Sequence, residues 1–350
     1  MVGLALEGGG AKGAYQVGAY LALINSGIKF DFIAGTSIGA FNAAMMAKGN
    51  PEALVNLWLS LTSDIIGLDS DLVKKFKTKK IKLADIKNGF SSLKKILKNK
   101  GIDTAPLMQI FNDNIDEKKL RKKKTKMGLI TVKLKKMEPV ELMIDDIPEG
   151  KLTEYILASC YLPVFAFKKI IDEEYYLDGA FHNNLPLQLL EKQGCKTIYT
   201  VSLGSIGFKN NKISKDTKVI QIKPKKSLGS LLVLDPEISL LNMRRGYLDA
   251  LKAISKADGK KYYFKYKNDR YYSRIIRKMD SKLIAKLKKQ YKAKTDKELV
   301  IKIVEQLLKK EKVDDLFLYN LKKQIRYLKK NAVIKKKDEQ EFIISCNLFW

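Results

Sequence analysis

The sequence predicts an α/β protein with a mostly parallel central sheet, followed by a basic helical C-terminal subdomain. Residues 1–63 alternate short apolar runs with stretches of helical apolar spacing, in the order strand, loop, helix, strand, tight turn, helix. That order is typical of parallel strands joined by crossover helices. Strand-like runs return between residues 127 and 222, and from about residue 270 apolar residues recur at helical spacing among many lysines.

The N-terminal part of the chain supplies the elements that carry most of the candidate motifs. We expect, in order, a strand at Val2–Glu7, a glycine-rich turn at Gly8–Gly13, a helix at Ala14–Ser26, a strand at Phe30–Ala34 and a helix at Ile38–Lys48. Lysine-rich stretches follow, with eleven lysines between residues 74 and 100 and the run KKLRKKKTK at 118–126. We expect these stretches, at about residues 64–126, to be surface insertions.

The remaining elements set the expected domain boundaries. Beyond the strand-like alternation of 127–147, we expect a strand around Val164–Ile171, a helix from Pro186, strands at Thr197–Ser202 and Val219–Ile222, a long helix at Pro236–Ala257 and a strand at Tyr262–Tyr266. Residues 1–223 then form the main domain, residues 224–269 continue its core, and residues 270–350 form the basic helical subdomain.

The charge balance of the chain is strongly basic. There are 67 Lys and Arg residues against 38 Asp and Glu, which gives a net charge of +29 over 350 residues. Such a field favours a polyanionic partner, either nucleic acid or an anionic membrane surface. Only seven of the basic residues are Arg, and the Lys, Ile and Asn bias of an AT-rich genome is an alternative explanation of much of the excess.

Cysteine and histidine are scarce. Cys160, Cys195 and Cys346 have no paired spacing, which argues against a disulfide framework and against a Cys-rich zinc site. His182 is the one histidine, so one chain cannot build a site with two His ligands, and we expect no metal. The N-terminus has no signal-type core, and no apolar run approaches the ~20 residues of a membrane span. We expect a cytoplasmic protein, soluble or bound to a membrane surface.

The sharpest local motif is Gly35-Thr36-Ser37-Ile38-Gly39. It fits G-x-S-x-G, directly after an expected strand and at the start of an expected helix, which is the context of a nucleophile elbow. Such a turn is so tight that only glycine fits beside the serine, and the N-terminus of the helix adds amide donors. Ser37 is therefore the candidate nucleophile. The alternative is an ordinary glycine-rich turn with a serine near the helix cap.

A serine nucleophile needs a base, and LDGAFHNNLP at residues 177–186 offers two. A triad would place Asp178 and His182 four residues apart in one loop, which is unlike the order found in α/β-hydrolases. The simpler interpretation makes Asp178 itself the base of a Ser–Asp dyad and His182 a loop or surface residue. Asp178-Gly179 is also a common turn dipeptide, which is the structural alternative.

The segment GGGAKG at residues 8–13 is the candidate source of donors for a developing oxyanion. Consecutive glycines let the backbone approach closely, and Lys12 adds positive charge or holds the loop through a carboxylate. The segment also fits the dinucleotide fingerprint G-x-G-x-x-G, but the second expected strand ends without the acidic residue that this fingerprint needs. A phosphate-binding Walker A loop is excluded as well, because no Gly-Lys-Ser/Thr follows.

Together, these motifs resemble the patatin-like phospholipase family. The family pattern is a G-G-G-x-K/R-G loop near the N-terminus, a G-x-S-x-G elbow about 25 residues later, and a D-G-G/A motif much further on. This sequence has GGGAKGAYQVGAY, GTSIGAFNAA and LDGAFHNNLP in that order, and ASCYLPVF at 158–165 is similar to the family's A-S-x-x-x-P-x-F block. The resemblance covers roughly residues 1–203, perhaps to 223, and nothing is recognised in residues 224–350.

The resemblance implies a three-layer α/β/α fold and hydrolysis of acyl esters of lipids, with no metal or other cofactor. Carried over by position, Ser37 is the nucleophile, Asp178 is the base, and Gly8, Gly9 and Gly10 form the oxyanion hole. The remaining matching positions support these motifs; they are Lys12, Gly13, Gly35, Gly39, Gly179 and Ala180. The continuation of the DGA loop as Phe-His-Asn departs from the family pattern without an obvious mechanistic meaning.

The sequence leaves three functional interpretations open. The first is a lipid acyl hydrolase of the phospholipase A or lysophospholipase type, held at anionic membranes by its lysine clusters. The second is a nucleic-acid-associated protein, suggested by the net charge and by KKYYFKYKNDRYY, although no reading motif occurs and forked Arg side chains are few. The third is a catalytically silent regulatory protein on the same fold. The amphipathic stripes of the C-terminal helices fit core packing or an interfacial face.

Overall fold

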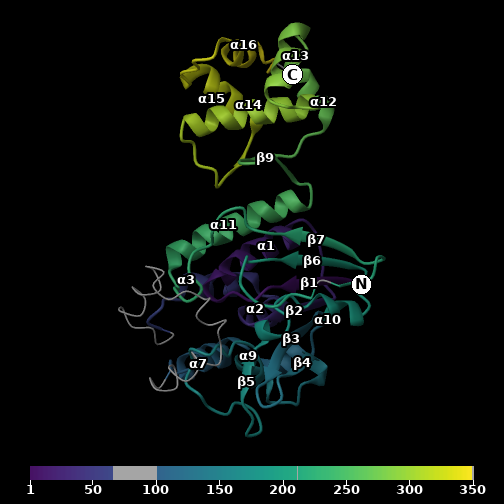
Figure 1. Ribbon diagram of the computed structural model, residues 1–350, viewed down its shortest axis with the longest axis vertical. Helices are drawn as coiled ribbons and strands as arrows, with labels where there is room; N and C mark the ends of the chain where they lie inside the picture. The colour runs from purple at the N-terminus through teal and green to yellow at the C-terminus, as the bar shows by residue number, and fades with distance from the viewer. Residues whose placement is uncertain (66–100, 211, 349–350) are drawn as a thin grey trace. The chain divides into compact units, whose positions relative to one another are not determined.

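The computed structural model describes residues 1–65, 101–210 and 212–348 (Figure 1). The lysine-rich stretch at 74–100, expected as a surface insertion, lies outside the described residues. By its internal contacts the chain divides into two compact units, Met1–Ala250 and Leu251–Trp350. Within the described residues, no helix has both the length and the apolar character needed to cross a bilayer.

The first unit is built on a seven-stranded sheet. Its strands are β1 (Val2–Leu6), β2 (Phe32–Thr36), β3 (Lys126–Lys133), β4 (Glu138–Met143), β5 (Tyr176–Asp178), β6 (Thr197–Val201) and β7 (Lys218–Ile222). The order is β4-β3-β2-β1-β6-β7, and Figure 1 shows the strands stacked in this sequence. Strands β3, β2, β1, β6 and β7 are mutually parallel, whereas β4 and β5 both pair antiparallel with β3. The predicted mostly parallel sheet is confirmed.

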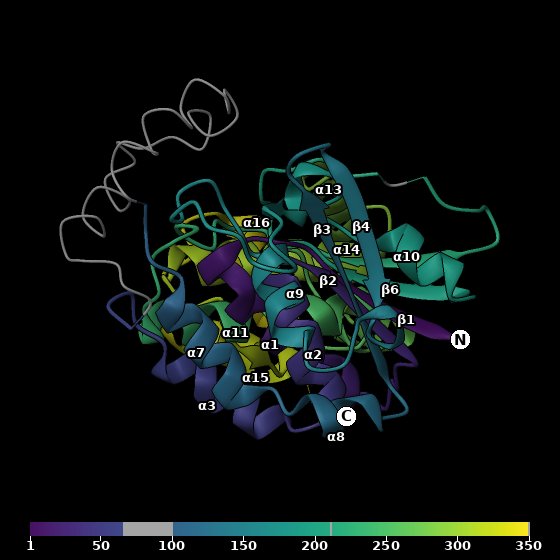
Figure 2. The ribbon, with the colours of Figure 1, turned by 90° about the horizontal axis from the view of Figure 1, so that it is seen from below.

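Helices cover both faces of this sheet. They are α1 (Ala14–Asn25), α2 (Ile38–Lys48), α3 (Pro51–Ser60), α7 (Ala105–Asn114), α8 (Glu117–Arg121), α9 (Leu152–Ser159), α10 (Leu187–Lys192) and α11 (Pro236–Ala253), whose end crosses the boundary between the units. Ala34 of β2 lies in one apolar cluster with Leu190 of α10, whereas the next residue, Gly35, faces Gly39 of α2. Because successive strand residues point to opposite faces, α10 and α2 cover opposite faces. Figure 2 shows α1, α2 and α9 on one side of the strands and α10 on the other, so the fold is a three-layer α/β/α.

Two stretches of the first unit differ from expectation. The strand expected at Val164–Ile171 is wrong, because this stretch is irregular and the strand that pairs with β3 is β5. A strand of three residues is too short for its alternation to be visible in a sequence. Within the expected surface insertion, α7 buries Phe111 completely against Phe41 of α2, with ring centroids 4.7 Å apart. Residues 105–114 therefore contribute to the core.

The second unit is a helical body with a small sheet, and the predicted helical C-terminal region is confirmed. Its elements are β8 (Ala257–Asp258), β9 (Tyr263–Lys265), α12 (Asp269–Ile276), α13 (Ser281–Gln290), α14 (Asp296–Lys310), β10 (Leu318–Tyr319), α15 (Leu321–Asn331) and α16 (Lys337–Ser345). Because β9 pairs with both β8 and β10, these strands belong to the second unit. The boundary drawn by contacts thus precedes β8, whereas the sequence expectation placed it after β9, near residue 270.

A buried carboxylate organises the connection between β8 and β9. Glu305 of α14 is only 4% exposed, and its Oε1 accepts hydrogen bonds from the backbone N–H groups of Lys260, Lys261 and Tyr262 at 2.6, 2.8 and 3.0 Å. Hydrogen bonds to a charged acceptor are among the stronger ones in proteins, so one side chain holds the whole turn.

We expect Glu305→Ala to destabilise the second unit. The substitution leaves three backbone N–H groups without their acceptor, and an unpaired buried donor costs about 1–3 kcal/mol. Hydrogen exchange of the amides at 260–262 should accelerate and the urea midpoint of this unit should fall. Glu341→Ala, which removes an exposed carboxylate from α16, is the matched control. Equal behaviour of the two variants would show that the Glu305 contacts contribute nothing to stability.

Candidate active site

Strands β2 and β5 run toward each other along one edge of β3. Thr36, the last residue of β2, is in register with Ile130, and Asp178, the last residue of β5, is in register with the next residue, Thr131. Because β2 is parallel and β5 antiparallel to β3, the chain ends of both strands meet at one place. Ser37 follows β2 directly, so this topology brings Ser37 and Asp178 together across 141 positions of sequence.

The turn at Ser37 is as tight as the G-x-S-x-G pattern predicts. A Cβ on Gly35 would stand 2.0 Å from the carbonyl of Gly39, and a Cβ on Gly39 would stand 2.5 Å from the carbonyl oxygen of Leu6. Ser37 itself has a φ of 56° and a ψ of −132°, a backbone region that residues with side chains rarely adopt. Such a conformation costs on the order of 1–3 kcal/mol and persists only where the surroundings impose it.

The Ser37 hydroxyl donates a hydrogen bond of 2.6 Å to Oδ2 of Asp178. The other carboxylate oxygen, Oδ1, accepts the N–H of Ala180 at 2.8 Å, which holds the carboxylate in place. Ser37 is 7% exposed and Asp178 is 1% exposed. Glycine is required at position 179, because a Cβ there would stand 2.1 Å from the carbonyl oxygen of Ile130. The DGA motif is therefore the local geometry that delivers Asp178 to Ser37.

Burial decides the proton affinity of Asp178. Removal from water raises the pKa of Asp178 to about 6, while the hydrogen bonds from Ser37 and Ala180 act in the opposite direction. His182 does not contact Ser37: its Nε2 lies 3.3 Å from Oε1 of Glu141 on β4, and its side chain is 38% exposed. Of the two bases considered from the sequence, Asp178 is the one in contact with the serine.

Two neighbours of Ser37 come from the ASCYLPVF block. Ser159, the last residue of α9, accepts the Ser37 N–H at 2.9 Å and donates to the Ile130 carbonyl oxygen at 2.6 Å. It thereby ties the strained elbow to β3. Cys160 lines the adjoining pocket, and burial raises the pKa of its thiol well above the usual value. The neutral thiol is a weak nucleophile. The sequence identified this block by its resemblance to the family but assigned no role to either residue.

The glycine loop adjoins Ser37 but its three amides are not equivalent. A Cβ on Gly8 would stand 3.0 Å from the Ser37 Cβ, so the two backbones are immediate neighbours. The Gly8 N–H already donates to Asn184, at 3.0 Å to Oδ1 and 3.2 Å to the carbonyl oxygen. The amides of Gly9 and Gly10 have no such acceptor among the described residues, and Gly10 lines the pocket with Ser37. Asn184 was not singled out in the sequence.

Of the two roles considered for Lys12 from the sequence, positive charge beside the glycine loop stays a prediction, whereas the ion pair with a carboxylate is made by another lysine. Among the described residues, the ion pair that Glu7 forms is not with Lys12. Burial lowers the pKa of Lys12, while the nearby Glu7 opposes the shift. Lys209 instead pairs with the fully buried Glu7 at 2.8 Å, and Glu7 also accepts the N–H groups of Leu203 and Ser205. A carboxylate thus fixes the approach to the loop, but its partner comes from residue 209.

A buried amide network connects both ends of the glycine loop to the helix behind Ser37. Gln16 donates to the Glu7 carbonyl at 2.6 Å, and Asn42 of α2 donates to the Gly13 carbonyl at 3.1 Å and to Gln16 Oε1 at 2.8 Å. The indole N–H of Trp58 donates to Asn42 Oδ1 at 2.9 Å. Gln16, Asn42 and Trp58 are all fully buried. The network therefore sets the position of the loop relative to the elbow.

An apolar pocket reaches Ser37. Phe41 of α2, Trp58 of α3 and Phe111 of α7 contribute aromatic rings, and most other lining residues are aliphatic. Among the described residues that line it, Ser37 has the only hydroxyl. The chemistry of the wall suits a long apolar group whose polar end lies at the serine. Within the described ranges, no three His, Cys, Asp or Glu side chains are gathered as metal ligands.

The comparisons with known proteins concern the first unit above all. The family model for patatin-like phospholipase matches residues 4–190. Patatin-like phospholipase domain-containing protein 7 of Rattus norvegicus is 28% identical over 219 residues, which is 58% of this chain and 14% of that protein. Lysophospholipase NTE1 of Kluyveromyces lactis is 26% identical over 272 residues, 73% of this chain and 16% of that protein. The chain therefore spans a small part of the length of these curated relatives.

Among solved structures, VipD from Legionella pneumophila is 13% identical, with a TM-score of 0.43 over 98% of this chain and 83% of that chain. The family model matches more than half of the chain, and it includes the glycine loop, the Ser37 elbow and Asp178. This chain belongs to the patatin-like phospholipase family.

Proposed function

We propose that this chain hydrolyses acyl esters of lipids, with Ser37 as nucleophile and Asp178 as its base. The observation that carries the proposal is the 2.6 Å hydrogen bond between these two side chains at an apolar pocket. A hydroxyl becomes an effective nucleophile when a base in hydrogen-bond contact takes its proton. Membership in the family and the names of the relatives support lipid esters as the substrate class.

The reaction follows in two halves. In the first, Asp178 takes the Ser37 proton as Oγ attacks the ester carbonyl carbon, and the resulting intermediate collapses to an acyl-enzyme while Asp178 returns the proton to the leaving alcohol. In the second, Asp178 takes a proton from water, whose oxygen attacks the acyl carbon and releases the fatty acid, and Ser37 Oγ recovers the proton. A pKa of about 6 suits this exchange, since the carboxylate is ionised near neutral pH yet holds a proton briefly.

The developing oxyanion needs donors that are already in place. We propose the amides of Gly9 and Gly10 for this role, because neither donates to another of the described residues. The sequence expectation also included Gly8. Its N–H donates to Asn184, so we assign Gly8 the role of holding the loop against Ser37. The N-terminus of α2 adds the positive end of its dipole behind Ser37.

The apolar pocket is the proposed acyl-chain site. Its rings and aliphatic side chains bury hydrocarbon, and each buried CH₂ contributes roughly 0.8 kcal/mol. An ester with its acyl chain in this pocket has its carbonyl carbon beside Ser37. Phospholipids and lysophospholipids both meet this requirement.

An anionic membrane surface is the proposed site of action of this chain. The net charge of +29 supports attraction to such a surface, and the three cysteines, which are buried and unpaired, suit the reducing cytoplasm. The nucleic-acid alternative uses the same charge, and the silent regulatory alternative keeps the fold without turnover. Competition between anionic vesicles and duplex DNA distinguishes membrane binding from nucleic-acid binding. The activity of the variants described next distinguishes a hydrolase from a silent regulatory protein.

Ser37→Ala and Asp178→Asn should each lower fatty-acid release from phospholipid vesicles by roughly a thousandfold or more, as loss of a nucleophile or its base does in serine hydrolases. The assay contains EDTA, because the mechanism uses no metal. His182→Ala is the matched control and should keep most of the activity. Full activity of Ser37→Ala would refute the nucleophile assignment, and a similar loss in all three variants would point to general disruption of the loop.

The rate should fall as the pH drops through about 6. The base must be ionised, burial raises the pKa of Asp178 to about 6, and protonation below that pH removes the base. On a soluble short-chain ester, kcat/KM should decrease about tenfold per pH unit on the acidic side. His182→Ala is the control and must retain the same inflection. An inflection that disappears in His182→Ala assigns the titration to the histidine and contradicts the prediction.

Asn42→Leu should lower kcat by roughly ten- to a hundredfold with little change in KM. The substitution frees both ends of the glycine loop, and a misplaced catalytic group about 1 Å away costs on the order of a hundredfold. Asn50→Leu, at the exposed N-cap of α3, removes an asparagine from the neighbouring helix as control. Gln16→Leu serves as a second test if Asn42→Leu folds poorly. A stability loss with unchanged kcat in both network variants would mean that the network has no role in positioning the loop.

A further inference from the structure

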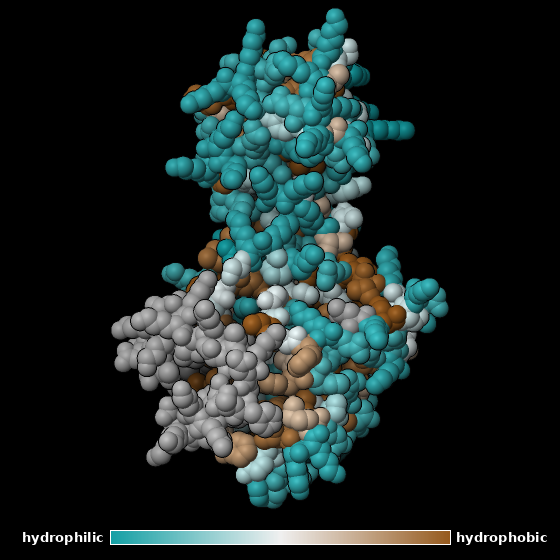
Figure 3. Space-filling model, in the orientation of Figure 1, coloured by the Kyte–Doolittle hydropathy of each residue, from teal (hydrophilic) through white to brown (hydrophobic). Residues whose placement is uncertain are grey.

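The second unit carries a disproportionate share of the positive charge. Residues 251–350 hold 29 Lys and Arg against 12 Asp and Glu, so they account for +17 of the net +29 of the chain. The face of this unit seen in Figure 3 is mostly hydrophilic, with scattered apolar patches. Its apolar helix stripes are used internally, since Leu299, Ile325 and Phe342 are buried in its own core. The charge is therefore presented to solvent on a folded body.

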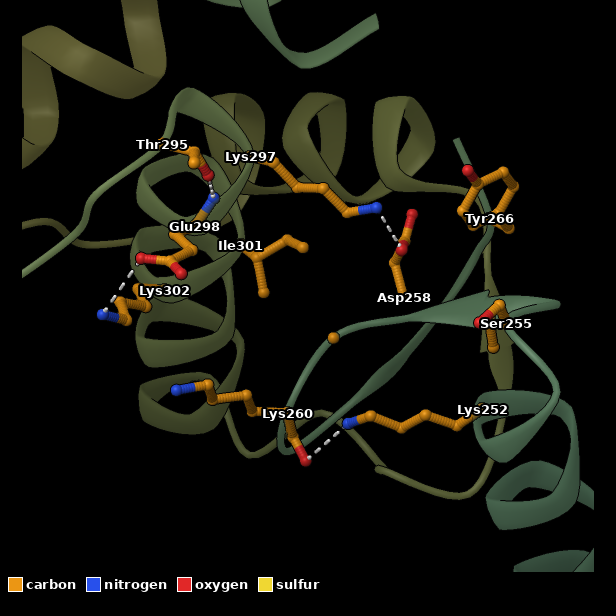
Figure 4. A pocket seen from close by; sticks show the side chains of 12 residues that line it. Lys252, Ser255, Asp258, Lys260, Tyr266, Thr295, Lys297, Glu298, Ile301 and Lys302 are labelled. Carbon is orange, nitrogen blue, oxygen red and sulfur yellow. Dashed lines mark hydrogen bonds and ion pairs between the residues drawn. The ribbon is translucent and has the colours of Figure 1, made fainter. Parts of the chain in front are cut away.

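Lysines gather in two adjoining pockets of this unit, which together we name the lysine groove. The first is lined by Lys252, Lys260, Lys297 and Lys302, and Lys260 and Lys302 also line the second, with Lys261, Lys309 and Lys310. Figure 4 shows Lys260 extending from the turn between β8 and β9 toward α14, the helix that carries Lys297 and Lys302. In the same view Lys297 reaches Asp258 and Lys302 lies beside Glu298.

The acidic side chains of the groove are already engaged. Glu305 accepts three backbone N–H groups of the turn 260–262, as described above. Asp258 is 7% exposed and accepts from Lys297 at 2.6 Å and from the Tyr272 hydroxyl at 2.7 Å. Glu298, which also lines the first pocket, accepts the Lys294 N–H at 2.8 Å and lies 4.0 Å from Lys302, and Lys310 pairs with Glu339 outside the groove at 3.2 Å. Seven lysines thus line the groove against three acidic side chains, so its net charge stays positive. Lys261 and Lys309 form no ion pair or side-chain hydrogen bond with other residues of the described ranges.

We propose that the lysine groove binds a ligand carrying two or more phosphate groups. Holding several ammonium groups around one space costs Coulomb repulsion, which a multivalent anion relieves. Compact ammonium charges suit phosphate oxygens, and two pockets that share Lys260 and Lys302 provide two neighbouring positions for phosphate. The turn that bears Lys260 and Lys261 is already fixed by Glu305, so binding costs little loop entropy. This site is separate from Ser37 and does not depend on the proposed hydrolysis.

The test uses the full chain with Ser37→Ala, so that lipid probes survive. Calorimetry compares inorganic phosphate with tripolyphosphate, and sedimentation compares phosphatidylcholine vesicles with and without phosphatidylinositol bisphosphate. The groove variant is Lys261→Ala with Lys309→Ala. The control, Lys323→Ala with Lys330→Ala on α15, makes the same charge change at exposed lysines that line neither pocket.

Tripolyphosphate should bind at least tenfold more tightly than phosphate. The groove variant should weaken that binding by about tenfold or more, since a lysine near an anionic surface contributes about a fivefold factor, and the control should stay within about twofold. Retention on bisphosphate vesicles that is lost in the groove variant identifies a lipid headgroup as the source, and tripolyphosphate binding without vesicle retention identifies a soluble one. Equal losses in both variants, equal affinity for phosphate and tripolyphosphate, or preferential binding of duplex DNA that the groove variant leaves unchanged would overturn the proposal.

Discussion

The first unit depends on one constraint, the sharing of a single edge of β3 by two strands that run in opposite directions. Strand β2 occupies the edge up to Ile130, and β5 occupies it from Thr131 onward. The carboxyl ends of both strands must then lie side by side, which places Ser37, directly after β2, next to Asp178, the last residue of β5. A strand of three residues contributes little stability by itself, so β5 exists because β3 and the neighbouring turns hold it. The position of the carboxylate is in this sense a property of the sheet.

The surroundings of Ser37 compensate for a backbone that is unfavourable on its own. Its positive φ is maintained by Ser159, which accepts the Ser37 N–H, and by the contact between Gly35 and Gly39. On the other side, the Gln16–Asn42–Trp58 network holds the glycine loop with every polar atom of Asn42 engaged. Fully satisfied polar networks in a dry interior specify one arrangement, because each alternative leaves a donor or acceptor unpaired. The arrangement that the proposed acyl transfer needs is thus fixed by the fold itself.

The sequence predicted the candidate site residues that lie in short glycine-containing motifs, and it predicted the long helices. Tight turns leave glycines beside Ser37 and Asp178, so the elbow and the DGA loop were recognisable, and the strongly periodic C-terminal helices were predicted as a group. Strand β5 was missed because three residues show no period, and a strand was placed at Val164–Ile171 instead. Ser159, Asn184 and Asn42 act through contacts with residues far away in sequence, and such contacts leave no local pattern. The hydrogen bond from the Gly8 N–H to Asn184 could not be predicted for the same reason, since the two residues lie 176 positions apart.

Three buried carboxylates differ in the donors around them, and the difference bears on the role of base that we propose for Asp178. Glu7 accepts two backbone amides and pairs with Lys209, and Glu305 accepts three backbone amides. Asp178 accepts one backbone amide and has no cationic partner among the described residues, so burial prevails and its pKa rises to about 6. Its second oxygen is left for the Ser37 hydroxyl. A carboxylate with more donors would hold its negative charge too firmly to accept a proton, and the sparse surroundings of Asp178 are what suit it to act as a base.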